Sequence, residues 1–352
     1  MLTAKENLLE CIRGGNPDRF VNQYEFVRLL MNPSGLHSPR PKRGEPDCKN
    51  AWGVTYSYPM NVPAGFPVHT PDKVVIQDIE QWQKYVHAPS LDFCNEEWDM
   101  FKAQYDAVDT TKALKAAFVA PGLFEQCHHL GEIVNTLQNL IEYPDEMHDL
   151  IKYLTEYELR LAELICDKLH PDTLFHHDDW GGQKTTFMSP TMFEEFFVEP
   201  YKEIYGYYHN HGVDIVIHHS DSYAATLVPD MIEMGIDIWQ GCFSTNNLPE
   251  LIKKYGGKIS FMGGIENCLV DYEGWNREEI RKVVDKTLGE CGNKYFIPCI
   301  AQGGPGSVFK GVYATLGEEI DSYNCEHFGL KKEDIEAARL PEIGRASCRE
   351  RV

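Results

Sequence analysis

The chain has 352 residues, of which 43% are hydrophobic and 12% aromatic, enough for one large barrel or two smaller domains. Its formal net charge of -21 argues against nucleic acid or an anionic membrane as the partner, because like charges repel. No apolar run approaches the roughly 18–20 residues of a membrane span. The N-terminus reads as a polar helix start, and the 11 cysteines include no Cys-x-x-Cys pair. We therefore expect a cytoplasmic protein with mostly free thiols.

The first 115 residues show little regular periodicity. The pattern of residues 18–28 predicts the end of a helix followed by a first strand at 20–27. Residues 33–71 are rich in Pro, Gly, Tyr and Lys, a composition typical of long loops. We expect these loops to cap the mouth of the fold, as a lid does.

From residue 116 onward, apolar runs alternate with amphipathic helical stretches, and Ser-Pro and Gly signals mark helix ends. The strands are expected at 117–121, 173–179, 213–219, 236–241, 258–263 and 294–300, and the helices through 169 and at 190–211, 223–234, 248–255, 276–290 and 307–322. This alternation predicts a parallel sheet. The number of consecutive units favours a (β/α)8 barrel, and the absence of Gly-x-Gly-x-x-Gly after an early strand disfavours a dinucleotide fold.

We therefore predict a single barrel domain over residues 1–341, in which residues 1–115 supply the first strands and the mouth loops. Residues 342–352 lack apolar periodicity and are abruptly basic, which indicates a non-native tail.

Several predicted strands end in residues that bind metals or carry protons. The run at 215–221 ends in His-His-Ser-Asp and the run at 173–179 in His-His-Asp-Asp, whereas those at 238–242 and 295–299 end in cysteine. The carboxyl ends of barrel strands carry the chemistry, so we expect these ends to converge. Alternation along a strand turns His219 and Asp221 inward and His218 toward the helices.

A set of short motifs resembles the uroporphyrinogen decarboxylase superfamily. The resemblance covers residues 1 to about 325. Its motifs are Asn16-Pro-Asp-Arg19, Trp52-Gly-Val54, His177-Asp-Asp-Trp-Gly-Gly-Gln183, Ser189-Pro190, Pro200-Tyr201, His219-Ser-Asp-Ser222 and Phe261-Met-Gly-Gly-Ile265. The superfamily contains cofactor-free decarboxylases of uroporphyrinogen III and zinc-dependent methyltransferases that act with a corrinoid (cobalamin) protein.

The resemblance favours the methyltransferase branch. The arginine-rich block with which the decarboxylases bind substrate carboxylates is absent, and Glu25 stands in the corresponding segment between Arg19 and Arg28. The alternatives are a uroporphyrinogen-type decarboxylase and a non-catalytic protein that binds a corrinoid or tetrapyrrole.

The methyltransferase branch carries zinc on His-x-Cys and on a distant Pro-x-Cys. Here His219 and Cys299 match, and Asp221 replaces the middle cysteine. Because aspartate also binds zinc, His219, Asp221 and Cys299 form the expected ligand set, and Cys242 could join or replace one of them. The alternative is a hydrogen-bonded His–Asp pair with Cys299 as a core thiol.

The resemblance also implies further roles. Asp179 matches the family's pocket aspartate and is expected to give or take a proton, with His219 as the second catalytic residue. Gln183, Tyr24, Glu125 and Gln302 are the expected substrate contacts, and the barrel mouth is expected to dock the corrinoid protein. The expected cofactors are Zn²⁺ and the partner's corrinoid, and the substrate is a small methyl donor or acceptor.

Overall fold

The structure is a computed structural model that describes residues 1–62 and 64–340. The tail predicted at 342–352 lies outside the described residues. None of the helices within these ranges is long and apolar enough to cross a membrane.

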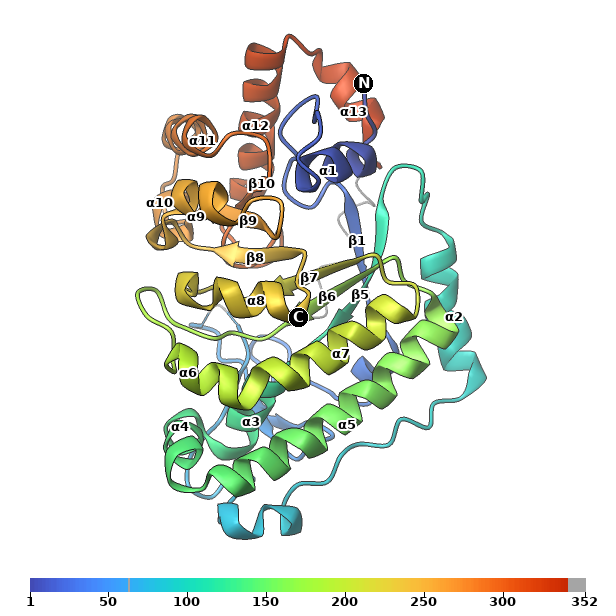
Figure 1. The fold of residues 1–352 in the computed structure, drawn as a ribbon, viewed down its shortest axis with the longest axis vertical. Coiled ribbons are helices and arrows are strands. Elements are labelled where there is room, and N and C mark those ends of the chain that lie inside the picture. Colours follow the sequence, from blue (N-terminus) through green and yellow to red (C-terminus); the bar gives the residue numbers. More distant parts are fainter. Residues whose placement is uncertain (63, 341–352) are drawn as a thin grey trace.

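A curled parallel sheet forms the centre of the molecule (Figure 1). In the described part of the chain it has seven strands, ordered as they occur along the sequence: β1 (Val27–Leu30), β5 (Leu114–Val119), β6 (Thr173–His177), β7 (Ile215–His219), β8 (Ile238–Cys242), β9 (Ser260–Ile265) and β10 (Phe296–Ile300). Each helical crossover returns the chain to the neighbouring position, as successive β-α units require.

The two edges of this sheet approach each other. Gln23 lies just before β1, and its backbone N–H donates to the carbonyl oxygen of Pro298 in β10 (3.1 Å). The contact curls the sheet toward closure, and the predicted barrel class is confirmed, with seven strands in the described residues. The first strand begins at Val27 instead of residue 20, because residues 23–26 form a turn in which Gln23 has a φ of 48°.

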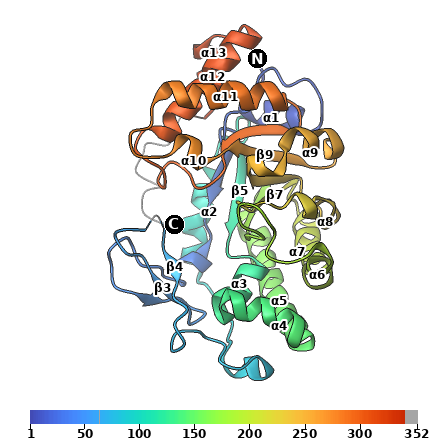
Figure 2. The same ribbon diagram turned by 90° about the vertical axis from the view of Figure 1, so that its left-hand side faces the viewer.

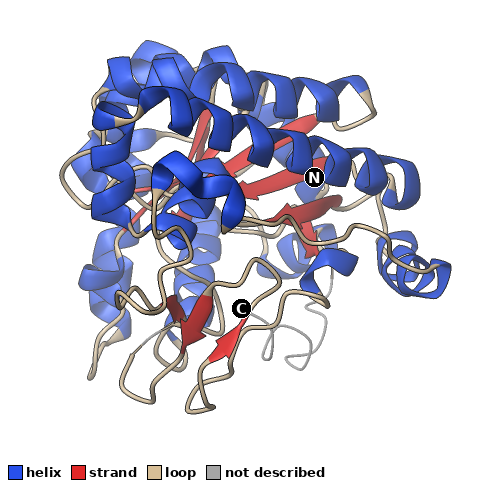
Figure 3. Cartoon of the chain, turned by 90° about the horizontal axis from the view of Figure 1, so that it is seen from below, coloured by secondary structure: helices blue, strands red, loops and turns tan. Residues whose placement is uncertain are grey.

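Helices cover the outside of the sheet. They are α1 (Ala4–Ile12), α2 (Asn95–Asp106), α3 (Leu123–Gly131), α4 (Ile133–Glu142), α5 (Pro144–Leu169), α6 (Pro190–Phe193), α7 (Glu199–Asn210), α8 (Val228–Met234), α9 (Leu248–Tyr255), α10 (Asn267–Val270), α11 (Arg277–Cys291), α12 (Val312–Phe328) and α13 (Lys332–Ala338). Figure 3 shows the longer helices along one side of the sheet and further helices at its ends.

The predicted mouth loops contain a small antiparallel sheet, made of β2 (Cys48–Lys49), β3 (Thr55–Ser57) and β4 (Phe66–Pro67). It stands away from α6–α9 (Figure 2). The Tyr56 hydroxyl of β3 hydrogen-bonds with His129 Nδ1 of α3 (3.2 Å). This contact ties the segment to the helix that follows β5, at the carboxyl end of the parallel strands.

Alternation in β6 and β7 divides four neighbouring histidines between the two faces of the sheet. His176 and His218 face the helices, where the Tyr205 hydroxyl of α7 meets the Nδ1 atoms of both rings (3.0 and 2.8 Å). The helix-facing orientation of His218 agrees with the sequence prediction. The next residue of each strand, His177 and His219, therefore faces the other side.

Candidate active site

His177 and His219 meet at the ends of β6 and β7. The strand register pairs them directly, and their rings stack with centroids 4.3 Å apart and an angle of 24° between planes. Asp179 follows two residues after His177. Its carboxylate and one nitrogen of each imidazole all lie within 4.8 Å of one another. We call His177, Asp179 and His219 the mouth cluster.

Hydrogen bonds to Nδ1 orient both imidazoles of the mouth cluster. His177 Nδ1–H donates to Glu125 Oε2 of α3 (2.8 Å). His219 Nδ1–H donates to the side-chain oxygen of Gln240, which lies opposite it on β8. An amide oxygen can only accept, so in the neutral His219 ring Nε2 carries the free lone pair. This nitrogen lies 3.8 Å from Asp179 Oδ1.

Glu125 and His177 form an ion pair. Burial is the largest single effect and opposes both charges. The charge and hydrogen bond of His177, with smaller contributions from His129 and His128, together lower the pKa of Glu125 to about 2. The charge and hydrogen bond of Glu125, with the charges of Asp179 and Asp221, together raise the pKa of His177 to about 10 against the effect of burial. Burial and then the His177 charge lower the pKa of His219 to about 3. The site therefore holds one imidazolium and one neutral imidazole near neutral pH.

The carboxyl groups of Asp179 and Asp221 lie so close together that ionisation of one disfavours ionisation of the other. Asp179 Oδ1 accepts the amide N–H of Asp221 (2.9 Å). Burial raises the pKa of Asp179, and burial followed by repulsion from Asp179 raises the pKa of Asp221 further. The Asp221 side chain also hydrogen-bonds with Gln302. Asp221 is thus the carboxyl that more readily stays neutral.

Asp178 is buried just after the end of β6, between His177 and Asp179, and it anchors the mouth. Its carboxylate accepts the amide N–H groups of Phe124 (3.0 Å) and Glu125 (2.7 Å) in the first turn of α3. It also accepts the Trp180 indole N–H (3.0 Å) and the Tyr201 hydroxyl. These bonds fix α3 against the end of β6 and so position Glu125.

Two of the other expected substrate contacts, Tyr24 and Gln302, lie near Asp221. Tyr24 is near Asp221 and Cys299, and burial raises the pKa of its hydroxyl. Gln302 bonds Asp221 as described. Gln183 lies exposed on the loop after β6, where its carbonyl accepts the Thr245 hydroxyl (2.9 Å).

The ligand partners expected for His219 are not brought together. In the described residues, the two groups whose ligand atoms all lie within 4.8 Å include neither Asp221, Cys299 nor Cys242. Cys299 is completely buried in β10, and burial raises the pKa of its thiol. Cys242 is also completely buried, and its thiol donates to the Trp239 carbonyl (3.3 Å).

A β-bulge separates Cys242 from the site. Gln240 is opposite Met262 on β9, but Cys242 is opposite the next residue, Gly263. The extra residue is Gly241, with a φ of 99°. Because a bulge breaks the alternation, Cys242 does not share the direction of Gln240.

The position of Glu25 gives no information about the charge of the substrate. It is buried and paired with Arg339 (3.1 Å) and Arg19 (3.6 Å). The sequence argument treated Glu25 as a residue of the substrate cleft, whereas the structure gives it a role in joining the segment before β1 to the end of α13.

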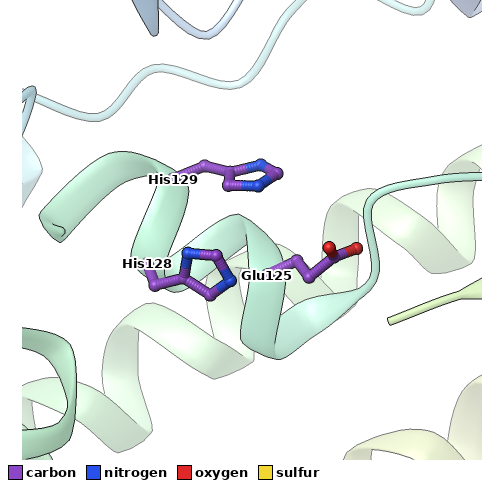
Figure 4. Close-up of side chains that lie close together, drawn as sticks. All are labelled: Glu125, His128 and His129. Atoms are coloured by element: carbon purple, nitrogen blue, oxygen red, sulfur yellow. The ribbon is translucent and has the colours of Figure 1, made fainter. Parts of the chain in front are cut away.

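A second group of potential ligands lies on α3. Glu125, His128 and His129 occupy one helical face at i, i+3 and i+4, with ligand atoms within 4.8 Å. Figure 4 shows the two imidazole rings and the Glu125 carboxylate side by side on α3. That carboxylate bonds His177, so Glu125 belongs to the surroundings of the mouth cluster.

The mouth cluster fits the zinc that the family resemblance implies. Imidazole nitrogen and carboxylate oxygen are ordinary zinc ligands. Metal-bound histidines typically donate their other ring N–H to a carboxylate or a carbonyl oxygen, as both rings do here. Gln240 and His177, which complete this pattern, were not among the predicted site residues, although alternation turns both toward His219.

A curled parallel β-α sheet with ligand-type side chains at its strand ends is the arrangement of a (β/α)-barrel enzyme. The sequence profile of the family "Uroporphyrinogen decarboxylase (URO-D)" matches residues 50–300. The chain therefore belongs to the uroporphyrinogen decarboxylase family, as its motifs predict.

A solved structure of another protein shows the same fold. A methyltransferase from Methanosarcina mazei matches with a TM-score of 0.63 at 14% identity, over 92% of this chain and 99% of that one. An endo-beta-1,4-mannanase from Cellulomonas fimi reaches a TM-score of 0.39 at 12% identity, over 93% of this chain and 75% of that one, too low to support an argument. No curated protein matches the chain.

Proposed function

We propose that this protein is a zinc-dependent methyltransferase that moves a methyl group between a small molecule and the corrinoid of a partner protein. Family membership and the shared fold of the Methanosarcina mazei methyltransferase support the general class. The observation that carries the proposal is the mouth cluster, because oriented imidazoles beside a carboxylate are suited to a catalytic metal.

When bound, zinc supplies a Lewis acid that stabilises the group gaining or losing the methyl. His219 is the metal ligand common to the sequence motif and the mouth cluster. Asp179 and Asp221 are the carboxyls that can hold or deliver a proton beside it, since burial raises the pKa of both. Tyr24, Glu125, Gln183 and Gln302 are the proposed substrate contacts, of which Glu125 and Gln302 bond His177 and Asp221.

The charges around the cluster favour a neutral or cationic substrate. Before a metal binds, Glu125 and Asp179 contribute two carboxylates against one imidazolium on His177, and Asp221 more readily stays neutral. A zinc ion that displaces the His177 proton brings this sum to zero. A polycarboxylate such as uroporphyrinogen needs cations around it. Methyl ethers and methylated amines carry no such requirement.

The test is an anaerobic reaction of the metal-loaded protein with a Co(I) corrinoid and a panel of methyl ethers and methylated amines. We expect at least one donor to form methyl-Co(III), seen as a change in the visible corrinoid spectrum. Decarboxylation of uroporphyrinogen instead would assign the protein to the other branch of its family.

A further inference from the structure

We propose that the metal in this site is held by His177, Asp179 and His219, and not by the cysteine-containing set of the sequence motif. The inference deepens the proposed function, since it names the ligands of the metal on which that function rests. It assigns the metal to imidazole and carboxylate donors, without a thiolate.

The first argument is preorganisation. Glu125 and Gln240 each accept the Nδ1–H of one imidazole, so Nε2 of each ring is left to bind a metal, which displaces the Nε2 proton of the His177 imidazolium as it binds. The strand register stacks the two rings, with centroids 4.3 Å apart, before any ion binds. Little rearrangement is then needed for the three ligand atoms to meet one ion.

The second argument is access. The side chains of His177 and Asp179 are 29% and 27% exposed, and that of His219 is 9% exposed. A catalytic metal needs a fourth position open to water or substrate. Cys299 is instead completely buried.

The third argument concerns the competing donors. The side chain of Asp221 hydrogen-bonds with Gln302, and the backbone N–H of Asp221 donates to Asp179 Oδ1 (2.9 Å). Asp221 therefore supports the proposed ligand Asp179 instead of binding the metal itself. With Asp179 bound to the metal, Asp221 is the carboxyl that remains for proton transfer. The Cys242 thiol is directed to the Trp239 carbonyl.

The experiment compares metal content and cobalt spectra in matched variants. Wild type, His177→Ala, Asp179→Asn, His219→Ala, Cys299→Ser and the exposed-histidine control His211→Ala are purified without chelator, and circular dichroism confirms folding. Zinc is then counted by mass spectrometry, and its affinity is measured by competition with a chelator. We expect the first three variants to bind zinc at least about tenfold more weakly, as loss of even an outer partner does. Cys299→Ser and His211→Ala should bind as wild type does.

The Co(II)-substituted protein gives an independent readout. It should show no thiolate-to-cobalt charge-transfer band, and its spectrum should be the same in Cys299→Ser. Any one of four results would overturn the assignment. They are a thiolate band in the wild-type spectrum, loss of metal in Cys299→Ser, full zinc affinity in His177→Ala, and a wild type that binds neither zinc nor cobalt. Metal bound as proposed without methyl transfer would refute the function alone, and methyl transfer with a Cys299-bound metal would refute the ligand set alone.

Discussion

The imidazole rings of His177 and His219 stack with their centroids 4.3 Å apart, on adjacent strands whose register places the two residues opposite each other. The stack brings together two imidazole rings whose residues lie 42 positions apart in the sequence, from 177 to 219. Parallel pairing of β6 with β7 is thus what creates the site.

Gln240 should control metal affinity although it does not touch the metal. Gln240→Met removes the acceptor of the His219 Nδ1–H, so the ring loses its fixed orientation. We expect zinc affinity to fall roughly 10–100-fold, measured by chelator competition. Gln240→Glu keeps an acceptor and should restore most of the affinity; equal loss in both variants would argue against an orienting role.

Asp178 should matter more for stability than its neighbours. Asp178→Ala leaves the buried donors of Trp180 and Tyr201 and two amides of α3 without their acceptor. At about 1–3 kcal/mol for an unsatisfied group, we expect the free energy of unfolding in urea to fall by about 3 kcal/mol or more. Asp178→Asn retains one acceptor oxygen and should lose less. A loss below about 1 kcal/mol for the alanine variant would contradict this anchoring role.

Much of this architecture follows from local patterns. The helix at 248–255 was predicted with the bounds that α9 has, because a Gly-Gly pair at 256–257 follows it. Alternation correctly sent His218 to the helix layer. Both signals are contained in a few neighbouring residues.

Non-local effects account for the differences. The turn at Gln23 displaces the first strand, and the bulge at Gly241 changes the direction of Cys242, yet neither follows from periodicity. Glu25 finds its partner Arg339 more than 300 residues away. His177 could have been found by alternation with Asp179, but its partner Glu125 depends on how α3 docks.

Asp230 on α8 should make stability depend on pH. Burial, then Glu194 and Glu233, raise its pKa from 3.8 to about 6. A carboxyl with a raised folded-state pKa stabilises the fold below the unfolded pKa, and that contribution is lost as pH rises through about 6. Asp230→Asn should therefore melt at a higher temperature than wild type at pH 7.5 and show no gain near pH 4. The exposed control Asp99→Asn should show no such pattern; an Asp230→Asn gain that is equal at both pH values would refute this explanation.

The protein should not convert uroporphyrinogen III to coproporphyrinogen at a useful rate. The carboxylates of Glu125 and Asp179 balance the charge of a bound zinc, which leaves no surplus positive charge at the mouth for a polycarboxylate. Anaerobic incubation followed by chromatography of the oxidised porphyrins measures this directly. Robust turnover would show that the protein belongs with the decarboxylases of its family.

The most direct test of the account is methyl transfer to a Co(I) corrinoid by wild type, His219→Ala and the control His211→Ala, with a donor that works for wild type. We predict that wild type and His211→Ala form methyl-Co(III) at similar rates. His219→Ala should form none, because the metal that stabilises the leaving group is lost. Full activity of His219→Ala with the same donor would remove the metal from the mechanism and contradict the central claim.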